Sequence, residues 1–313
     1  MSPARVLEAV PNFSEGRDPA VVEAIVDAMS AAGVDILDWS ADADHHRSVV
    51  TLIGSPESVE NAAVAGARVA IERIDLNRHE GVHPRVGALD VLPFVPMAGL
   101  TLADARACAR RVGARLAHEL GVPVYYYGAA SEPAGRPLSA LRRGGFETLV
   151  AGFPDALPPD VLPPRWQHTG AHPTAGVTCV GARPLLLAWN VFVTGIELDA
   201  AQRIAASIRE ARGGFLGVRA LALRLPGSQR LQISMNLENV VLTPPIAVFR
   251  RIESLVQEQG GEIEETEIIG MLPDELVWGA AADRLKLAPD TARRLLSRSV
   301  LAVMTGDQSL YEA

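Results

Sequence analysis

The first half of the chain alternates short apolar runs with longer segments in which apolar residues recur every three or four positions. The longer segments are typical of amphipathic helices, and the short runs have the length and β-branched content of buried strands. Asp18-Pro19 and Ser55-Pro56 are suitable starts for two helices, and Gly121 is a suitable end for a third. We therefore expect strands at 5–10, 34–39, 48–54, 87–96 and 123–128, and helices at 18–33, 55–74 and 101–121.

The second half repeats this order of elements. The patterns predict strands at 184–193, 218–225, 230–237 and 262–270, helices at 199–214, 244–261, 273–285 and 288–300, and a frayed tail over the last ten residues. Between the halves, the stretch from Pro133 to about Thr178 is rich in Pro and Gly and shows no periodicity. Long stretches of this kind are usually functional loops or disordered.

Each half has the order β-α-β-β-α-β, which forms a sheet with helices on one face. The predicted fold is therefore α/β (α+β), with two ferredoxin-like subdomains at residues 1–182 and 183–313. The halves share no sequence identity worth quoting, so the duplication is inferred from element order alone. The open faces of two such sheets could cover each other and leave a cleft lined by the long loop.

Composition narrows the class of function. A net charge of -8 and a pI near 5.4 argue against nucleic acid or an anionic membrane as the main partner. The N-terminus has no long apolar region and no apolar stretch reaches the roughly 18 residues of a membrane helix, so we expect a cytoplasmic protein without membrane contact. Cys108 and Cys179 make neither a disulfide framework nor a CxxC site, and Cys108 is expected to be a small buried residue.

The stretch NRHEGVHPRVGALDVLPF, residues 77–94, is the first candidate for chemistry. His79 and His83 have the spacing of a zinc-binding pair, but such a pair needs a helix to bring both rings to one face. Gly81 lies between them and Pro84 follows, which makes a helix unfavourable. We therefore expect no metal site here.

A catalytic interpretation fits His83 better. It lies in a loop directly before a predicted buried strand, where a rigid scaffold can hold a side chain that faces a cleft. Arg85 would lower the pKa of this imidazole by like-charge repulsion, and an imidazole that titrates near neutral pH is suited to moving a proton. The alternative is that either histidine only hydrogen-bonds the turn, and the residues alone favour neither interpretation.

Three further polar stretches lie at the ends of predicted strands. Residues 38–50 bring together three aspartates, two histidines and an arginine, although most runs of this kind are solvated loops. Glu8 and Asn12 lie at the end of the first strand and are candidates for a site. The alternative is that this stretch is only a turn in which Ser14 or Glu15 caps the next helix. Residues 167–183 contain glycines that would allow a ligand to approach the backbone, but no nucleotide-binding motif.

The motifs LEAVPNFSEGR, DADHHRSVVTLIGSPE, RHEGVHPRVGALDVLPFVP, VPVYYYG, HPTAGVTCVGAR and LAWNVFV follow one another along the chain. In this order and spacing they resemble the formiminotransferase domain of formiminotransferase–cyclodeaminases and of free-standing bacterial glutamate formiminotransferases. The resemblance extends to about residue 285 and does not include the cyclodeaminase half.

The resemblance implies a homodimeric folate-dependent transferase of histidine degradation and one-carbon metabolism. Such an enzyme moves the formimino group of N-formimino-L-glutamate to N5 of tetrahydrofolate, its co-substrate, and releases L-glutamate. The cleft between the subdomains would then bind folate, and the histidine of the family's His-Pro-Arg motif is His83. The folate-binding loop of the family corresponds to Gln167, His168, Thr169, Gly170, Ala171, His172, Pro173, Thr174, Ala175 and Gly176.

Substrate-binding roles are also implied by the resemblance. The residues concerned are Glu8, Asn12, Ser40, His46, Arg47, Arg85 and Arg183, of which the three arginines would hold anionic groups. Three positions depart from the family pattern: Ser40 replaces an aspartate, His46 an asparagine, and Thr169-Gly170 a Gly-Pro pair. There are two alternatives to formimino transfer. One is a catalytically impaired folate-binding protein of the same fold, and the other is a formyl transferase that uses the same site.

Overall fold

The structure, a computed structural model, describes residues 5–81, 84–240, 242–287 and 297. The chain divides into two compact units, Met1–Arg183 and Pro184–Ala313, and the expected mixed α/β class is confirmed by two sheets with accompanying helices. The elements of the first unit are β1 (Leu7–Ala9), β2 (Asn12–Phe13), α1 (Pro19–Ser30), β3 (Asp35–Asp42), β4 (Arg47–Gly54), α2 (Pro56–Arg73), η1 (Leu76–Arg78), β5 (Leu89–Pro96), α3 (Leu102–Leu120), β6 (Val124–Gly128), α4 (Leu138–Leu141), α5 (Gly145–Ala151) and β7 (Thr178–Ala182).

In the sheet of the first unit, β1 and β2 form one interrupted central strand. Both pair with β4 on one side and with β5 on the other. Pro11 stands at the interruption, since proline has no N–H to contribute to the ladder. β3 extends the sheet beyond β4, whereas β7 and then β6 extend it beyond β5. β5, β7 and β6 run parallel, and the other pairs are antiparallel.

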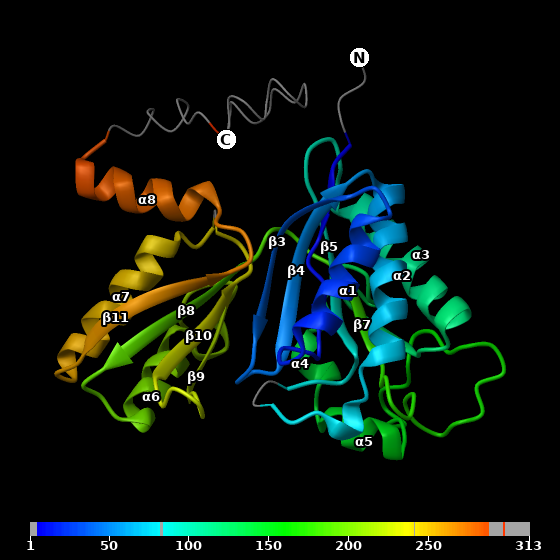
Figure 1. The fold of residues 1–313 in the computed structure, drawn as a ribbon. Helices are drawn as coiled ribbons and strands as arrows, with labels where there is room; N and C mark the ends of the chain where they lie inside the picture. Colours follow the sequence, from blue (N-terminus) through cyan, green and yellow to red (C-terminus); the bar gives the residue numbers. More distant parts are fainter. Residues whose placement is uncertain (1–4, 82–83, 241, 288–296, 298–313) are drawn as a thin grey trace. The chain divides into compact units, whose positions relative to one another are not determined.

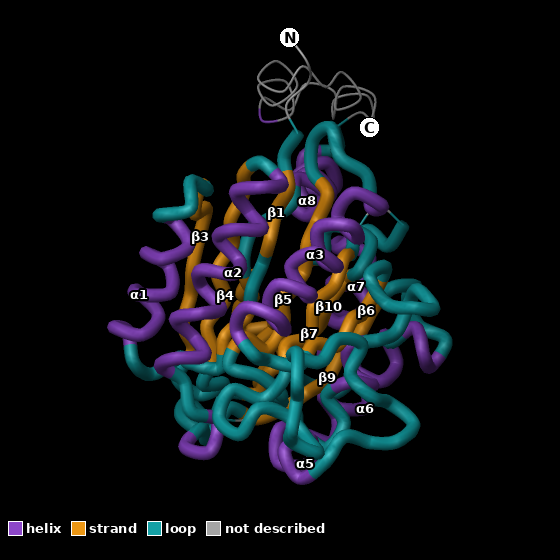
Figure 2. The backbone as a smooth tube through the Cα atoms, turned by 90° about the vertical axis from the view of Figure 1, so that its right-hand side faces the viewer, coloured by secondary structure: helices purple, strands orange, loops and turns teal. Residues whose placement is uncertain are grey.

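Helices α1, α2 and α3 lie side by side over one face of this sheet (Figures 1 and 2). The predicted helix starts are confirmed, because the side chain of Asp18 accepts the N–H of Ala20 and that of Ser55 accepts the N–H of Ser58. α3 ends at Gly121, whose φ of 72° is left-handed. Fully buried apolar residues that alternate along the strands pack under the helices, among them Leu7, Phe13, Val50, Leu52, Leu92 and Phe94.

The stretch predicted to be irregular, 133–178, is partly regular. It contains α4 and α5, which pack with Tyr125, Tyr127 and Cys179 into a second apolar cluster on the other side of the sheet. The glycine-rich segment that follows is not only a loop, because β7 is a buried strand between β5 and β6. A Cβ at Gly181 would lie 2.3 Å from the ring of Tyr127, so the glycine makes room for this ring.

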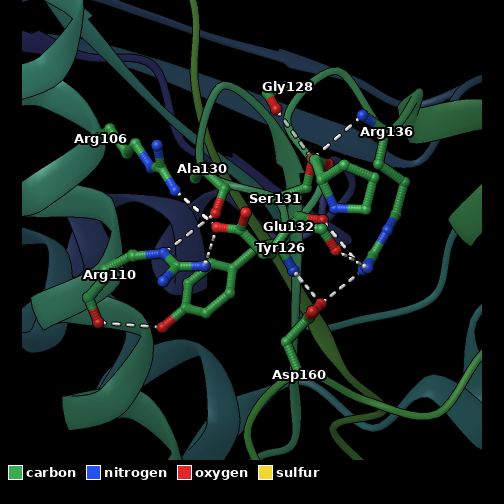
Figure 3. Close-up of polar contacts among 10 residues, drawn as sticks. Arg106, Arg110, Tyr126, Gly128, Ala130, Ser131, Glu132, Arg136 and Asp160 are labelled. Carbon is green, nitrogen blue, oxygen red and sulfur yellow. Dashed lines mark hydrogen bonds and ion pairs between the residues drawn. The ribbon is translucent and has the colours of Figure 1, made fainter.

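The outer edge of β6 is covered by a loop that Figure 3 shows in close-up. The backbone N–H of Tyr126 donates to Oδ2 of Asp160 at 2.7 Å, and the N–H of Gly128 donates to the carbonyl of Arg136 at 2.9 Å. Arg136 also forms an ion pair with Asp160 at 2.6 Å. These contacts satisfy edge N–H groups that would otherwise be open to pairing with another strand.

Replacing Asp160 is expected to destabilise the first unit. Asp160→Ala removes the acceptor of the Tyr126 N–H and the carboxylate partner of Arg136, which keeps only its bonds to backbone carbonyls. Both ion-pair side chains are less than one-fifth exposed (18% for Arg136 and 17% for Asp160). We expect a loss of about 2–3 kcal/mol in the free energy of unfolding, measured by urea denaturation. The control Glu132→Ala removes the exposed pairs with Arg106 and Arg110 and should cost less than about 1 kcal/mol. Equal losses in the two variants would contradict this interpretation.

The second unit contains β8 (Leu187–Thr194), α6 (Leu198–Ile208), η2 (Glu210–Arg212), β9 (Val218–Arg224), β10 (Leu231–Leu237), α7 (Pro245–Glu258), β11 (Glu262–Ile269) and α8 (Asp274–Leu285). Its sheet has the order β11-β8-β10-β9 and is antiparallel throughout.

The helix predicted at 199–214 ends early because Arg209 is extended, with ψ at 140°. The helix predicted at 288–300 lies outside the described residues except for position 297, and the predicted tail lies wholly outside them. None of the helices described is long and apolar enough to cross a bilayer.

Candidate active site

Polar residues singled out in the sequence share the sheet face that α1, α2 and α3 leave uncovered. Residues paired across antiparallel strands point to the same side of a sheet. Ser40 of β3 and Asn12 of β2 are both paired with Val49 of β4, and Asp42 is paired with Arg47. Phe13 and Val50, which follow Asn12 and Val49 in the sequence, belong to the helix-side core. Ser40, Asn12 and Arg47 are therefore on one face.

The turn between β2 and α1 is organised by the carboxylate of Glu15. Its Oε1 accepts the N–H groups of the next three residues at 2.8–3.0 Å. Burial raises the pKa of Glu15, but these backbone bonds and the neighbouring His46 outweigh it, so the net shift is downward. Neither Ser14 nor Glu15 caps α1, because Asp18 does so and Ser14 donates to the carbonyl of Gly87 at 2.7 Å.

His46 connects this turn to the segment that precedes residue 82. Its Nε2 lies 3.1 Å from Oε1 of Glu15, and its Nδ1 lies 3.0 Å from the carbonyl oxygen of Glu80. Both partners are acceptors, so the two bonds form together only when both ring nitrogens carry a proton. The ring of His79 stacks on that of His46, with centroids 4.1 Å apart and planes at 10°, and Nε2 of His79 donates to the carbonyl of His46 at 2.7 Å.

His79 is a buried part of this cluster, and its side chain is largely withdrawn from solvent. Burial is the main cause that lowers the pKa of His79, and the positive charges of His46 and Arg85 lower it further. The sequence predicted that the charge of Arg85 lowers the pKa of His83. The structure shows this effect of Arg85 on the pKa of His79, while His83 and Val82 lie outside the described residues.

Gly81 brings the segment before residue 82 into direct contact with the loop between β3 and β4. A Cβ at Gly81 would lie 2.6 Å from the carbonyl oxygen of His45 and 2.8 Å from Cβ of His46. Such distances are shorter than real Cβ contacts, and the first involves rigid backbone. Glycine is therefore required here for close packing of the two backbones.

Arg85 fastens the segment that follows residue 83. Its Nη2 donates to the carbonyls of Leu76 at 3.4 Å and His79 at 3.2 Å, and to Oε1 of Glu147 at 2.7 Å. The carbonyl of Arg85 accepts the N–H of Phe146 at 3.0 Å. Arg85 therefore holds the start of α5 against the turn at η1.

Asp90, at the start of β5, holds the same segment from another side. Its Oδ1 accepts the N–H of Val86 at 2.7 Å and that of Gly87 at 3.3 Å, and its Oδ2 accepts from Arg142, which ends α4. Asp90 is only 3% exposed, so these partners offset the cost of burying it. Sequence analysis singled out neither Asp90 nor Arg142, although an aspartate inside a predicted buried strand was a usable signal.

Arg47 lies close to both of these residues. Burial, followed in effect by the positive charge of Arg142, lowers the pKa of Arg47 to about 10, although the carboxylates of Asp90 and Asp42 act in the opposite direction. A narrow recess beside this group is lined by Phe13, Ser14, His45, His46, Arg47, His79, Arg85 and Asp90. Two of the three arginines predicted to hold anions, Arg47 and Arg85, thus border the same recess.

The third predicted arginine, Arg183, lies with Tyr127 and Glu8. Arg183 hydrogen-bonds the side chain of Tyr127, and burial raises the pKa of this phenol to about 12 against the opposing charges of Arg183 and Arg142. Glu8 is 4% exposed, and its Oε2 has no hydrogen-bond partner among the described residues. Burial raises the pKa of Glu8, and the charge of Arg183 offsets only part of this effect.

The turn at residues 172–176 packs against both ends of the segment that contains residues 82 and 83. The carbonyl of Thr174 accepts the N–H of Leu76 at 2.9 Å, and the carbonyl of Ala175 accepts the N–H of Ala88 at 2.9 Å. The predicted folate-binding loop and the predicted catalytic loop are therefore joined through their backbones in the first unit.

Within the predicted folate-binding loop, exposure changes along the chain. Gln167, His168 and Thr169 are exposed, Gly170, Ala171, Ala175 and Gly176 are buried, and His172, Pro173 and Thr174 form the partly exposed turn between them. Nδ1 of His172 accepts the N–H of Ala175 at 3.0 Å and stabilises the turn. Among the described residues, no group of three or more His, Cys, Asp or Glu side chains is arranged to hold a metal ion.

Comparison with known proteins identifies the family. Residues 6–183 match the N-terminal subdomain of the formiminotransferase domain, and residues 188–286 match the formiminotransferase domain. The chain belongs to the formiminotransferase family. The first match ends at the boundary between the two compact units, and the second begins shortly after it, at residue 188.

Relatives of this formiminotransferase family member include free-standing and bifunctional proteins. The glutamate formimidoyltransferase of Streptococcus pyogenes is 38% identical over 95% of this chain and 99% of its own length. That of Thermoplasma acidophilum is 35% identical over 94% of this chain and 97% of its own length. The formimidoyltransferase-cyclodeaminase of Sus scrofa is 37% identical over 89% of this chain, and the match spans 52% of that longer protein.

Enlarging Gly81 is expected to separate the two backbones that meet there. Gly81→Ala should lower the free energy of unfolding by about 1–3 kcal/mol, the usual cost of overpacking, and increase amide exchange at residues 76–81 and 84–88. Urea denaturation and hydrogen exchange measure the two effects. Gly152→Ala is the control, because a Cβ there would have no neighbour within 4 Å. Unchanged exchange in Gly81→Ala would contradict the proposed close contact.

Neutralising Glu8 is expected to have a pH-dependent effect on stability. A buried carboxyl whose pKa is raised makes the folded state bind more protons, so the wild type loses stability as pH rises from about 4.5 through the folded pKa. Glu8→Gln lacks this loss, so its stability relative to wild type should improve between pH 4 and pH 8 in urea titrations. Glu23→Gln, in the exposed part of α1, is the control and should show no such trend. A difference that stays constant over this pH range would refute the assignment.

Proposed function

We propose that this protein transfers the formimino group of N-formimino-L-glutamate to N5 of tetrahydrofolate and releases L-glutamate, with His83 as the general acid and base. The observation that carries this proposal is the 38% identity to a glutamate formimidoyltransferase along 99% of that protein's length. Histidine degradation, a cytoplasmic location and a homodimer are the corresponding expectations for its biological setting.

The proposed chemistry requires two proton movements. N5 of tetrahydrofolate attacks the amidine carbon of the donor, and the resulting tetrahedral intermediate loses a proton at N5 and gains one at the departing glutamate nitrogen. One imidazole can perform both steps in turn, which assigns them to His83. Binding the two substrates in a fixed relative orientation contributes a large part of the rate by itself.

The described neighbours of His83 support this role. The stacked His46 and His79, with Gly81, hold the chain before position 82, and the contacts of Asp90 hold it after position 85. Flanking residues held in this way limit the positions open to the residues between them, which favours the short distance that proton transfer needs.

Folate binding is proposed for residues 167–176 and for the open face of the first sheet. The turn at 172–176 is held by hydrogen bonds and adjoins the proposed catalytic segment. Oε2 of the buried Glu8 has no partner among the described residues and is an acceptor suited to the amino group of a pterin ring. Asn12, Ser40 and His46 are proposed substrate contacts on the basis of the shared face and the His46 contacts. The ferredoxin-like form of each subdomain, the cleft, and the boundary at residues 182 and 183 belong to this proposal.

Turnover of N-formimino-L-glutamate with tetrahydrofolate by the purified protein tests the proposal. His83→Ala should lower kcat by about 10²–10⁴-fold, the range for loss of a general acid-base group, while tetrahydrofolate still binds. His118→Ala, in an exposed position near the end of α3, is the matched control and should keep wild-type activity.

Three results would redirect the assignment. Full activity in His83→Ala would exclude the proposed proton carrier. Tight tetrahydrofolate binding by the wild type without turnover would favour a folate-binding protein, for which the serine at position 40 in place of the family's aspartate is the motivating observation. Turnover of N-formyl-L-glutamate in place of the formimino donor would favour the formyl transferase.

A further inference from the structure

His46 joins three segments of the first unit beside the recess that it helps to line. Its Nε2 lies 3.1 Å from Oε1 of Glu15, in the turn before α1, and its Nδ1 lies 3.0 Å from the carbonyl oxygen of Glu80. The carbonyl of His46 accepts Nε2–H of His79 at 2.7 Å, and the two rings are stacked. The side chain of His46 is 11% exposed, so these groups take the place of water as its partners.

Both ring bonds of His46 require its positively charged form. The carboxylate of Glu15 and the carbonyl of Glu80 only accept, so the two bonds form together when each ring nitrogen carries a proton. A neutral ring has one proton, and the carboxylate is the stronger acceptor, so this proton remains on Nε2. Nδ1 then presents a lone pair to the carbonyl oxygen of Glu80, and this bond is lost.

The ionisable groups around His46 come from four segments. They are Glu15 before α1, Asp42, His45 and Arg47 in β3, β4 and the loop between these strands, His79, Glu80 and Arg85 on either side of residues 82 and 83, and Asp90 at the start of β5. Glu15 supplies the carboxylate in contact with the ring of His46, and His45 forms its ion pair with Asp42. Burial is the main cause that lowers the pKa of His79, and the charges of His46 and Arg85 lower it further, so this ring is neutral at neutral pH and above.

Two hydrogen bonds thus tie the segment before residue 82 to the loop between β3 and β4, and they respond differently to pH. The bond from His79 to the carbonyl of His46 uses a neutral ring and persists as pH rises. The bond from His46 to Glu80 uses a charged ring and is lost as pH rises. Gly81 follows directly and packs so closely on His45 and His46 that a Cβ would not fit, so a displacement at Glu80 also disturbs this contact.

We infer that His46 in its doubly protonated form is a positioning residue: it fixes the backbone at Glu80 and thereby the chain that enters position 82. This role is additional to the substrate contact proposed for His46. Its link to catalysis rests on the proposed function, because that function places the proton carrier at His83. The attachment of Glu80 itself does not depend on that function and can be measured without substrate.

His46→Asn is the variant that separates the two ring bonds. The amide nitrogen of asparagine is bonded to Cγ, as Nδ1 of histidine is, so it can donate to the carbonyl of Glu80 without titrating. The φ of His46 is 50°, a left-handed value that asparagine, like histidine, adopts more readily than most residues. His46→Gly also suits this φ and removes both ring bonds. His118→Asn, in an exposed position near the end of α3, is the matched control.

Nuclear magnetic resonance of the ring nitrogens of His46, assigned from their loss in His46→Asn, tests the protonation. At about pH 5.5 both nitrogens should carry a proton, and towards about pH 8.5 the proton should leave Nδ1 and stay on Nε2. A neutral ring with its proton on Nδ1 would overturn the inference, because that ring would keep the bond to Glu80.

Hydrogen exchange tests the attachment of the segment. The N–H groups of Arg78 and His79 bond to the carbonyls of Asp75 and Leu76. Their protection factors should fall about threefold or more in the wild type and in His118→Asn between about pH 5.5 and about pH 8.5. They should change less than about twofold in His46→Asn and should be low at both pH values in His46→Gly. Amides of β10, in the second unit, are the internal reference.

Turnover supplies a readout that a purely structural role would not move. The ratio of kcat in His46→Asn to kcat in the wild type should rise about threefold or more between the same pH values, while the ratio of the KM values stays near one. His83 is present in both proteins, so pH effects on it cancel in this ratio. A role as substrate contact alone would change KM and leave amide protection unchanged.

The outcomes distinguish this inference from the proposed function. Protection at Arg78 and His79 that is independent of pH in the wild type overturns the inference, and so does a constant kcat ratio in an active enzyme. The expected ring protonation and amide protection in a wild type that shows no formimino transfer support the attachment of Glu80 by His46 and refute the proposed function.

Discussion

The arrangement of the site depends on one buried carboxylate, that of Asp90. It binds Val86 and Gly87 through one oxygen and Arg142 through the other. Asp90 is 3% exposed, and burying a carboxylate is costly unless such partners compensate it. The start of β5, the loop before it and the end of α4 are therefore fixed relative to one another by the need to satisfy this single group.

The described residues at 76–81 and 84–88 illustrate how a stretch with no helix or strand periodicity in its sequence becomes ordered. Leu76 and Ala88 bind the turn at residues 172–176, and Gly81 packs on the loop between β3 and β4. Each contact uses backbone groups of distant segments, which the surrounding sheet brings close together. Ordering a loop costs conformational entropy, and contacts at both of its ends offset that cost.

Elements with strong periodicity and clear caps were predictable from the sequence, as Asp18 and Ser55 at the starts of α1 and α2 show. β7 was not, because five residues that include a glycine carry too little periodicity to distinguish a strand from a loop. The role of Arg142 was hidden for a different reason. Its partner Asp90 is 52 residues away, and no local pattern reports a contact that only the folded sheet creates.

The resemblance to the family implies an aspartate at position 40, where this chain has serine, and this difference raises the question of whether a nearby acid takes its role. Asp42 lies two residues further along β3, on the same face. Its hydrogen bond from His45 is the main cause that lowers the pKa of Asp42 to about 2, against the effect of burial. A carboxyl with this pKa is ionised at neutral pH, so it cannot donate a proton there and is a weak base. Asp42 is therefore an ionised partner of His45 and not a proton donor at neutral pH, which agrees with the proposal that His83 performs both proton movements.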